Sequence, residues 1–237
     1  LKIDKVDNHP ISQSILKKIV NSIKKFSCDI IIFSDFRHGL FNKNSIDQFS
    51  KAVPKKVFKV ADSQVATRWG NITDFKNFDL ITPNEREARF SLADQDSSIS
   101  NLSRQLAFKT KFKNLILKLG ERGLVSVNRN NKKDKKAKDK TKAFALPSFT
   151  NNIVDTTGTG DALLAYSSLS LVKSQSLIVS SIIGSLAAAN ECERDGNVAI
   201  ESDEIMKKID SVKNLSGYKI TKKKSLRSNK SKKRRLI

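Results

Sequence analysis

Hydrophobic positions along the chain follow two alternating patterns, short apolar runs and longer stretches with helical spacing. Residues 11–26 place isoleucines four apart with lysines between them, which is typical of an amphipathic helix. Residues 28–36 are short, rich in isoleucine and end in polar positions, as a buried parallel strand does. Continued to residue 212, the alternation predicts helices at 44–53, 85–93, 97–111, 158–172, 177–192 and 202–212, and strands at 56–63, 78–84, 114–120, 124–129 and 143–149.

Strands that alternate with helices predict an α/β fold with a mainly parallel central sheet. The strand at 124–129 follows its predecessor after a glycine-containing turn, so we expect that pair to be antiparallel. The helix at 44–53 has Asn44 or Ser45 as its expected N-cap. The helix at 177–192 is apolar on nearly every face, which predicts complete burial.

The carboxyl ends of parallel strands form the ligand-binding edge of such a sheet. In this chain every one of these predicted ends carries a polar residue or glycine, at Ser34–Asp35, Ala61–Asp62, Pro83–Asn84 and Leu119–Gly120. A polar ligand lying along this edge needs such positions. For any single strand end, the alternative is that loops are simply polar.

Two basic segments account for most of the net charge of +21. Residues 129–142 contribute +6 and residues 211–237 contribute +11, which leaves +4 for the rest of the chain. The first segment is predicted to be a solvated insertion, and residues 213–237 a disordered tail. The alternative is that the tail contacts nucleic acid or an anionic surface.

The chain carries no mark of export or membrane insertion. Its two cysteines make neither a metal-binding spacing nor a disulfide framework, which fits a reducing cytoplasm. No apolar run approaches the roughly 18 residues that span a bilayer, and the first ten residues do not form a signal peptide. We therefore expect a cytoplasmic globular protein.

The segment 155–161 (DTTGTGD) carries the clearest candidate chemistry. Gly158 and Gly160 let the backbone approach an anion, and the first amides of a helix that starts there form a cradle for a phosphoryl group. Asp161 is a poor ligand for a phosphate, because the two negative charges repel. As a general base, however, it can take a proton from a hydroxyl. The segment is therefore compatible with a kinase without a Walker A lysine. On these residues alone, the alternative of a Thr-Gly turn with Asp161 as a first-turn helix charge stays open.

This segment strongly resembles the C-terminal signature of the ribokinase-like (PfkB) carbohydrate kinases. Further motifs are similar to those of the family in the same order, namely SDFRHG (34–39), TPNEREA (82–88), LKLGERG (117–123) and AAANECERDG (187–196). Within the family, they look most similar to the heptose 7-phosphate kinase domain of ADP-heptose synthesis. The resemblance covers about residues 3–212 and implies a three-layer fold whose N-terminal strands and lid are absent.

The resemblance implies ATP-dependent phosphoryl transfer to a hydroxyl of a sugar or sugar phosphate. It makes Asp161 the catalytic base and the amides of Gly158, Thr159 and Gly160 the anion hole. Asp35 is expected near the substrate, with a structural role at the end of its strand as an equal alternative.

The remaining implied contacts are with cations and the nucleotide. Asn84 and Glu87 are expected to hold Mg²⁺ through water, since that ion prefers oxygen ligands. Asp155 and Thr157 are expected to help bind a monovalent cation such as K⁺. Nucleotide contacts are expected at Lys118, Gly120, Gly123 and Gly196. The family commonly has threonine at the position of Lys118.

Two other functions stay open on the sequence alone. The first is a truncated or degenerate kinase that binds nucleotide without turnover. The second is a basic scaffold that binds nucleic acid or an anionic surface through its tail. A homodimer is a further candidate, because the absent strands would leave an apolar sheet edge that a second copy can cover.

Overall fold

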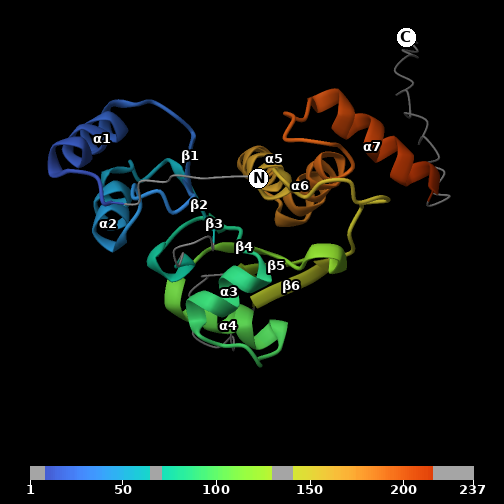
Figure 1. The fold of residues 1–237 in the computed structure, drawn as a ribbon, viewed down its shortest axis with the longest axis horizontal. Coiled ribbons are helices and arrows are strands. Elements are labelled where there is room, and N and C mark those ends of the chain that lie inside the picture. Colours follow the sequence, from blue (N-terminus) through green and yellow to red (C-terminus); the bar gives the residue numbers. More distant parts are fainter. Residues whose placement is uncertain (1–8, 65–70, 130–140, 216–237) are drawn as a thin grey trace, which may run out of the picture.

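The computed structural model describes residues 9–64, 71–129 and 141–215, which form a three-layer α/β fold (Figure 1). Its middle layer is a six-stranded sheet in the order β1-β2-β3-β4-β5-β6. The strands are β1 Ile30–Asp35, β2 Phe58–Ser63, β3 Leu80–Ile81, β4 Asn114–Lys118, β5 Leu124–Arg129 and β6 Thr141–Leu146. Strands β1 to β4 pair in parallel, whereas β5 pairs antiparallel with both β4 and β6. The mainly parallel sheet and the antiparallel pair are therefore confirmed.

Helices cover both faces of the sheet. The first layer consists of α1 Gln13–Lys25, α2 Lys43–Ala52, α3 Glu85–Leu92 and α4 Ile99–Thr110. The second consists of α5 Thr159–Ser174 and α6 Leu177–Cys192, with α7 Ser202–Leu215 packed on α6. Figure 1 shows α5, α6 and α7 gathered on the side of the sheet away from α3 and α4. Two short 3-10 turns, η1 Ile72–Asp74 and η2 Gly120–Arg122, complete the described elements.

The apolar runs of the central strands supply both cores. Side chains of successive strand residues point to opposite faces of a sheet. Ala61, Ile81 and Leu115 accordingly join the core under α1–α4. Their neighbours Val60, Leu80 and Ile116 join the core under α5 and α6. Burial on both faces explains why these strands appear in the sequence as continuous rather than alternating apolar runs.

The predicted N-cap of α2 was wrong. The cap is Asn42, whose side-chain oxygen accepts the Ser45 N–H at 3.0 Å. Ser45 Oγ in turn accepts the Asn42 N–H at 2.9 Å. Ser45 is therefore the N3 residue of a capping box and not the N-cap. Asn44 lies in the first turn.

Strand β3 is much shorter than the predicted 78–84. Only Leu80 and Ile81 form its ladder, although the Thr82 N–H still donates to the Ala61 carbonyl at 3.1 Å. At the other end the Asp79 carboxylate accepts the Lys59 N–H at 2.8 Å. Beyond Thr82, Pro83 has no N–H to continue the pairing.

Helix α6 has the predicted bounds, but complete burial was wrong at its first turn. Ile178 and Val179 are 54% and 43% exposed, while the rest of the helix packs against α5, α7 and β5. Ser181 of α6 and Ser126 of β5 are fully buried and share a hydrogen bond of 2.7 Å. Neither α6 nor another helix in the described residues is long and apolar enough to cross a lipid bilayer.

The two predicted basic segments lie mostly outside the described residues. The segment 129–142 connects β5 to β6, and the structure describes only its ends. The tail 213–237 is described only to residue 215, where α7 ends. At the other edge of the sheet, β2 is the only described strand that pairs with β1, and the Ile32 side chain of β1 is 37% exposed.

Candidate active site at the carboxyl ends of the strands

The candidate site lies where β2 and β4 end and α5 begins. Asp62 occupies the end of β2 and Lys118 the last position of β4. Gly160, in the first turn of α5, faces them, because a Cβ added to it would lie 3.4 Å from the Lys118 ammonium. The fold thus brings together three segments that are far apart in the sequence.

The N-terminus of α5 exposes amide groups to this site. Gly158 is the N-cap, with a left-handed φ of 78°, and the first intrahelical bond runs from the Ala162 N–H to the Gly158 carbonyl at 2.9 Å. The Thr159 N–H donates to the Thr156 carbonyl at 3.4 Å. The amides of Gly160 and Asp161 precede that first bond, so they remain available to an anion. The predicted anion-hole segment therefore coincides with a helix N-terminus.

A buried carboxylate packs against the N-cap of α5. Glu191 is 2% exposed, and its Oε1 accepts the Val198 N–H at 3.2 Å. Its Oε2 has no hydrogen-bond partner among the described residues. A Cβ on Gly158 would lie 2.6 Å from Glu191 Oε1 and would overlap the Asn197 side chain. Glycine is therefore required at this position, both by φ and by space, and sequence reasoning had not singled out Glu191 or Asn197.

Asp155, Thr157 and Gly196 meet at the other side of this turn. Asp155 Oδ1 accepts the Thr157 N–H at 2.9 Å. Hydrogen bonds from Thr157, with a further one from the Gly196 backbone, lower the pKa of Asp155, so its carboxylate stays charged. A charged carboxylate fits the predicted monovalent-cation site. Gly196 contacts this turn and does not line either cavity described below.

A cavity of about 460 Å³ opens beside the N-terminus of α5. Its lining includes five of the predicted residues, namely Lys118, Gly120, Gly123, Thr159 and Gly160. Leu124, Leu163, Ala188 and Cys192 supply an apolar wall. An apolar cavity with a few converging polar groups is typical of a small-molecule site.

A second cavity, of about 920 Å³, lies on the α3 side. It shares Lys118 and Gly120 with the first cavity and is also lined by Asn84, Glu85 and Arg89. Lys118 therefore borders both cavities.

Lys118 forms the charged centre of the site. Its Nζ lies 3.4 Å from Asp62 Oδ1 and 3.3 Å from Asp62 Oδ2, and the two side chains are only 15% and 4% exposed. Sequence reasoning placed Asp62 at a strand end and gave it no role. Its only signal was that position at the carboxyl edge of a parallel sheet.

Glu87 and Asp161, two of the carboxyl groups near Lys118, have raised pKa values. Burial, with the Asp62 charge, raises the pKa of Glu87 to about 7 against the opposing charge of Lys118. Burial and the Asp62 charge also raise the pKa of Asp161. Burial acts to lower the pKa of Lys118, but the charges of Asp62 and Glu87 outweigh it and leave that pKa raised. The ammonium therefore keeps its proton.

Asn84 and Glu87 form the capping box that starts α3. Asn84 Oδ1 accepts the Glu87 N–H at 2.8 Å, and Glu87 Oε2 accepts the Asn84 N–H at 2.7 Å. The predicted Mg²⁺ contacts are thus partly engaged by the helix end, and a protonated lysine shares their surroundings. Within the described residues no three acidic, histidine or cysteine groups are placed to hold a metal ion. These residues fit a protein-held divalent cation poorly.

Asp35 is fully engaged by its own loop and by the end of β2. It is 1% exposed, and its carboxylate accepts the Arg37 N–H at 2.8 Å, the Arg37 guanidinium at 2.7 Å and the Ser63 hydroxyl at 2.9 Å. It lines neither cavity. A substrate contact at Asp35 stays a prediction.

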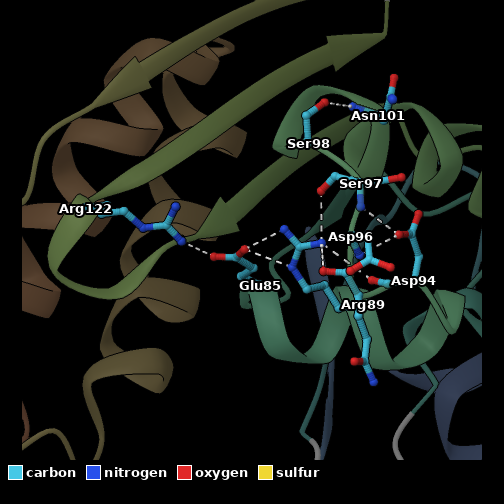
Figure 2. A network of polar contacts seen from close by, with 9 residues as sticks. Glu85, Arg89, Asp94, Asp96, Ser97, Ser98, Asn101 and Arg122 are labelled. Atoms are coloured by element: carbon cyan, nitrogen blue, oxygen red, sulfur yellow. Dashed lines mark hydrogen bonds and ion pairs between the residues drawn. The ribbon is translucent and has the colours of Figure 1, made fainter.

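The turn at 120–123 is held in place by an ion-pair network (Figure 2). Arg122 pairs with Glu85, which also pairs with Arg89 at 2.8 Å. Arg89 then donates to the carbonyls of Gln95 at 3.1 Å and Ser97 at 3.0 Å. The network ties the turn that lines both cavities to helix α3.

Gly123 has a structural reason to be glycine. Its φ is 82°, and a Cβ would overlap the Leu146 carbonyl at the end of β6. Gly120 has a φ of 62° with open space around it, so a ligand can approach its backbone.

The chain is similar in sequence to known carbohydrate kinases. The family model for the pfkB family carbohydrate kinases matches residues 31–203. The bifunctional protein HldE of Sulfurimonas denitrificans is 24% identical over 210 residues, which is 86% of this chain and 41% of that relative. The chain thus spans about two fifths of the length of this curated relative.

Solved sugar-kinase structures share the fold. Phosphofructokinase-2 from Escherichia coli in complex with potassium superposes with a TM-score of 0.70 at 16% identity, covering 86% of this chain and 63% of that one. Arabidopsis thaliana ribokinase complexed with ribose and ATP gives 0.63 at 20% identity, covering 86% and 61%. The predicted three-layer ribokinase-like fold is confirmed.

Proposed function

This chain belongs to the pfkB family of carbohydrate kinases, and we propose that it transfers the terminal phosphoryl group of ATP to a hydroxyl of a sugar or sugar phosphate. The observation that supports this most directly is the position of Asp161. It lies in the first turn of α5, next to amides that are available to an anion and near the Lys118 ammonium. A base and an anion site are what this reaction needs side by side.

In the proposed reaction Asp161 accepts the proton of the attacking hydroxyl. Burial and the nearby Asp62 charge raise the pKa of Asp161, which makes its carboxylate a stronger base than an exposed aspartate. The amides of the first turn of α5 stabilise the charge on the transferring phosphoryl group. No covalent enzyme intermediate is required.

Nucleotide binding is proposed for the cavity of about 460 Å³. Its apolar wall suits a base and ribose, and the glycine turn at 120–123 lets the backbone approach them. Thr159 and Gly160 line this cavity at the N-terminus of α5, where the phosphates are proposed to lie. Asp155 and Thr157 are proposed to bind a monovalent cation that stiffens this turn, and Mg²⁺ carried by ATP neutralises phosphate charge in solution.

The acceptor is proposed to be a sugar or sugar phosphate. HldE is the named relative, and the chain resembles the heptose 7-phosphate kinase domain, so heptose 7-phosphate is the first acceptor to test. Because the chain spans about two fifths of this relative, acceptor specificity is to be measured and not transferred from it.

An ADP-release assay with ATP, Mg²⁺, K⁺ and a panel of sugars and sugar phosphates tests the proposal. We expect release only when an acceptor is present, and we expect Asp161→Asn to reduce it by at least about 100-fold, since general-base catalysis contributes about that much. Asp203→Asn is the matched control, because Asp203 is an exposed first-turn aspartate of α7. Normal turnover by Asp161→Asn contradicts the base assignment. ATP binding without transfer to any acceptor favours a nucleotide-binding protein instead.

A further inference from the structure

Lys118 is held rigidly at the junction of the two cavities. Its backbone N–H donates to the Pro83 carbonyl at 3.0 Å, and its backbone bridges to Asn84 at the start of α3. Its side chain crosses the edge of the sheet towards Asp62 and α5. The ammonium is thus fixed between the end of β2 and the first turn of α5.

Asp62 gives the Lys118 ammonium a counter-ion, but the first turn of α5 opposes it. A helix N-terminus carries partial positive charge, so an ammonium near Gly160 is repelled by α5. A buried ion pair also loses much of its attraction to desolvation. The arrangement becomes more favourable when an anion contacts both the ammonium and the helix N-terminus, because both then attract it.

Asp62 does not saturate the ammonium. Lysine has three N–H donors, and charge-assisted hydrogen bonds are normally about 2.7–2.9 Å long. The contacts between Lys118 and Asp62 are 3.3 and 3.4 Å, and both go to one carboxylate. Donor capacity is therefore left on the side that faces the cavities.

Lys118 also faces the residues that resemble a magnesium site. Among the titratable groups that act on it are Asp62 of β2, Glu87 of α3 and Asp161 of α5. The Asn84–Glu87 capping box engages two of the oxygens there. A fixed positive charge therefore already acts on the carboxyl group that would hold a divalent cation.

Building on the proposed function, we propose that the Lys118 ammonium binds the terminal phosphate of ATP and supplies the positive charge that a divalent cation held at Asn84 and Glu87 would otherwise provide. Binding of ATP to this chain then depends only weakly on Mg²⁺. ADP lacks the phosphate that the ammonium would contact. Binding of ATP therefore depends on Lys118 more than binding of ADP does.

The test is calorimetric titration of the full chain with ATP and with ADP, each in EDTA and in Mg²⁺. We expect wild-type affinity for ATP to change little between the two conditions. We expect Lys118→Met to weaken ATP binding in EDTA by at least about tenfold, as loss of a hydrogen bond to a charged group does, and to weaken ADP binding less. Lys113→Met is the control, because Lys113 is 64% exposed and pairs with Asp79 away from the site.

A second variant guards against loss of folding. Lys118→Met leaves the buried Asp62 carboxylate without its counter-ion, so the double variant Asp62→Asn, Lys118→Met is titrated as well. Unchanged ATP binding in both variants overturns the inference and leaves the proposed function intact. The same holds if wild type binds ATP only with Mg²⁺. Absence of ATP binding by wild type in both conditions contradicts the inference and the proposed function together.

Discussion

Gly158, the N-cap of α5, lies directly against the buried carboxylate of Glu191. A Cβ on Gly158 would lie 2.6 Å from Glu191 Oε1, and Glu191 is only 2% exposed. The start of the helix that carries the proposed base is thus positioned by the end of α6. Space at this contact, and not φ alone, excludes other residues.

Gly158→Ala is therefore expected to destabilise the fold severely. The left-handed φ costs about 1–2 kcal/mol for a non-glycine residue, and overpacking adds about 1–3 kcal/mol. Gly196→Ala is the matched control, since its φ of 79° is nearly the same but a Cβ there meets nothing within 4 Å. Urea unfolding measures both. Equal losses of unfolding free energy in the two variants contradict the steric contact.

The Ser126–Ser181 hydrogen bond is expected to show strong coupling. Ser126→Ala or Ser181→Ala leaves one buried hydroxyl unpaired, which costs about 1–3 kcal/mol. The double variant removes both polar groups and is expected to be nearly as stable as wild type. A double-mutant cycle from urea unfolding gives the coupling energy. Additive single losses show that the two hydroxyls find other partners.

The network of Figure 2 predicts unequal roles for its two arginines. Arg122 is 61% exposed, so Arg122→Met is expected to cost less than about 1 kcal/mol. Arg89 is 22% exposed and also holds the carbonyls that follow α3, so Arg89→Met is expected to cost about 1–3 kcal/mol. Thermal unfolding of both variants measures the difference, and a larger loss for Arg122→Met reverses the assignment.

Glu87 is expected to make stability fall as pH rises. Its pKa is raised from 4.5 to about 7 in the folded chain, so the folded state favours the protonated form. This contribution is complete below pH 4.5 and is lost as pH rises through about 7. Glu87→Gln keeps an acceptor for the Asn84 N–H but does not ionise.

The measurement is urea unfolding of wild type and Glu87→Gln at pH 5 and pH 8. We expect the variant to gain at most about 3 kcal/mol relative to wild type between the two pH values, because one pKa unit corresponds to about 1.4 kcal/mol. The pKa of about 7 already includes the opposing charge of Lys118. Parallel pH dependence in the two proteins contradicts a raised pKa for Glu87.

Local sequence patterns predicted the layers of the fold but not where each helix and strand begins and ends. Continuous apolar runs identified β2 and β4, because their residues are buried on both faces. The length of β3 was not predictable from its apolar run, because the Asp79 side chain takes over one backbone partner. The N-cap of α2 was predicted too far along the chain, at Asn44 or Ser45, although Asn42 and Ser45 have the spacing of a capping box.

The candidate site was only partly predictable, for a related reason. The DTTGTGD segment has its own local geometry, so its helix start was readable from the sequence. The environment of Lys118 comes from Asp62, Glu87 and Asp161, which are brought together by strand order and not by spacing. Glu191 gave no signal in the sequence, because its contact with Gly158 is formed only in the folded chain.

The hairpin of β5 and β6 makes one end of the molecule a natural point for fusion. Leu124 begins β5 next to the candidate site, where it pairs with Lys118 of β4. Arg129 ends β5 and pairs with Thr141 of β6. A strand rises about 3.3 Å per residue, so the two ends are separated by roughly 17 Å. Lengthening a loop costs only about 0.6 kcal/mol per doubling, because closure entropy grows slowly. A reporter domain inserted between Arg129 and Thr141 would therefore leave the register of the sheet, and with it the chemistry at the other end, undisturbed.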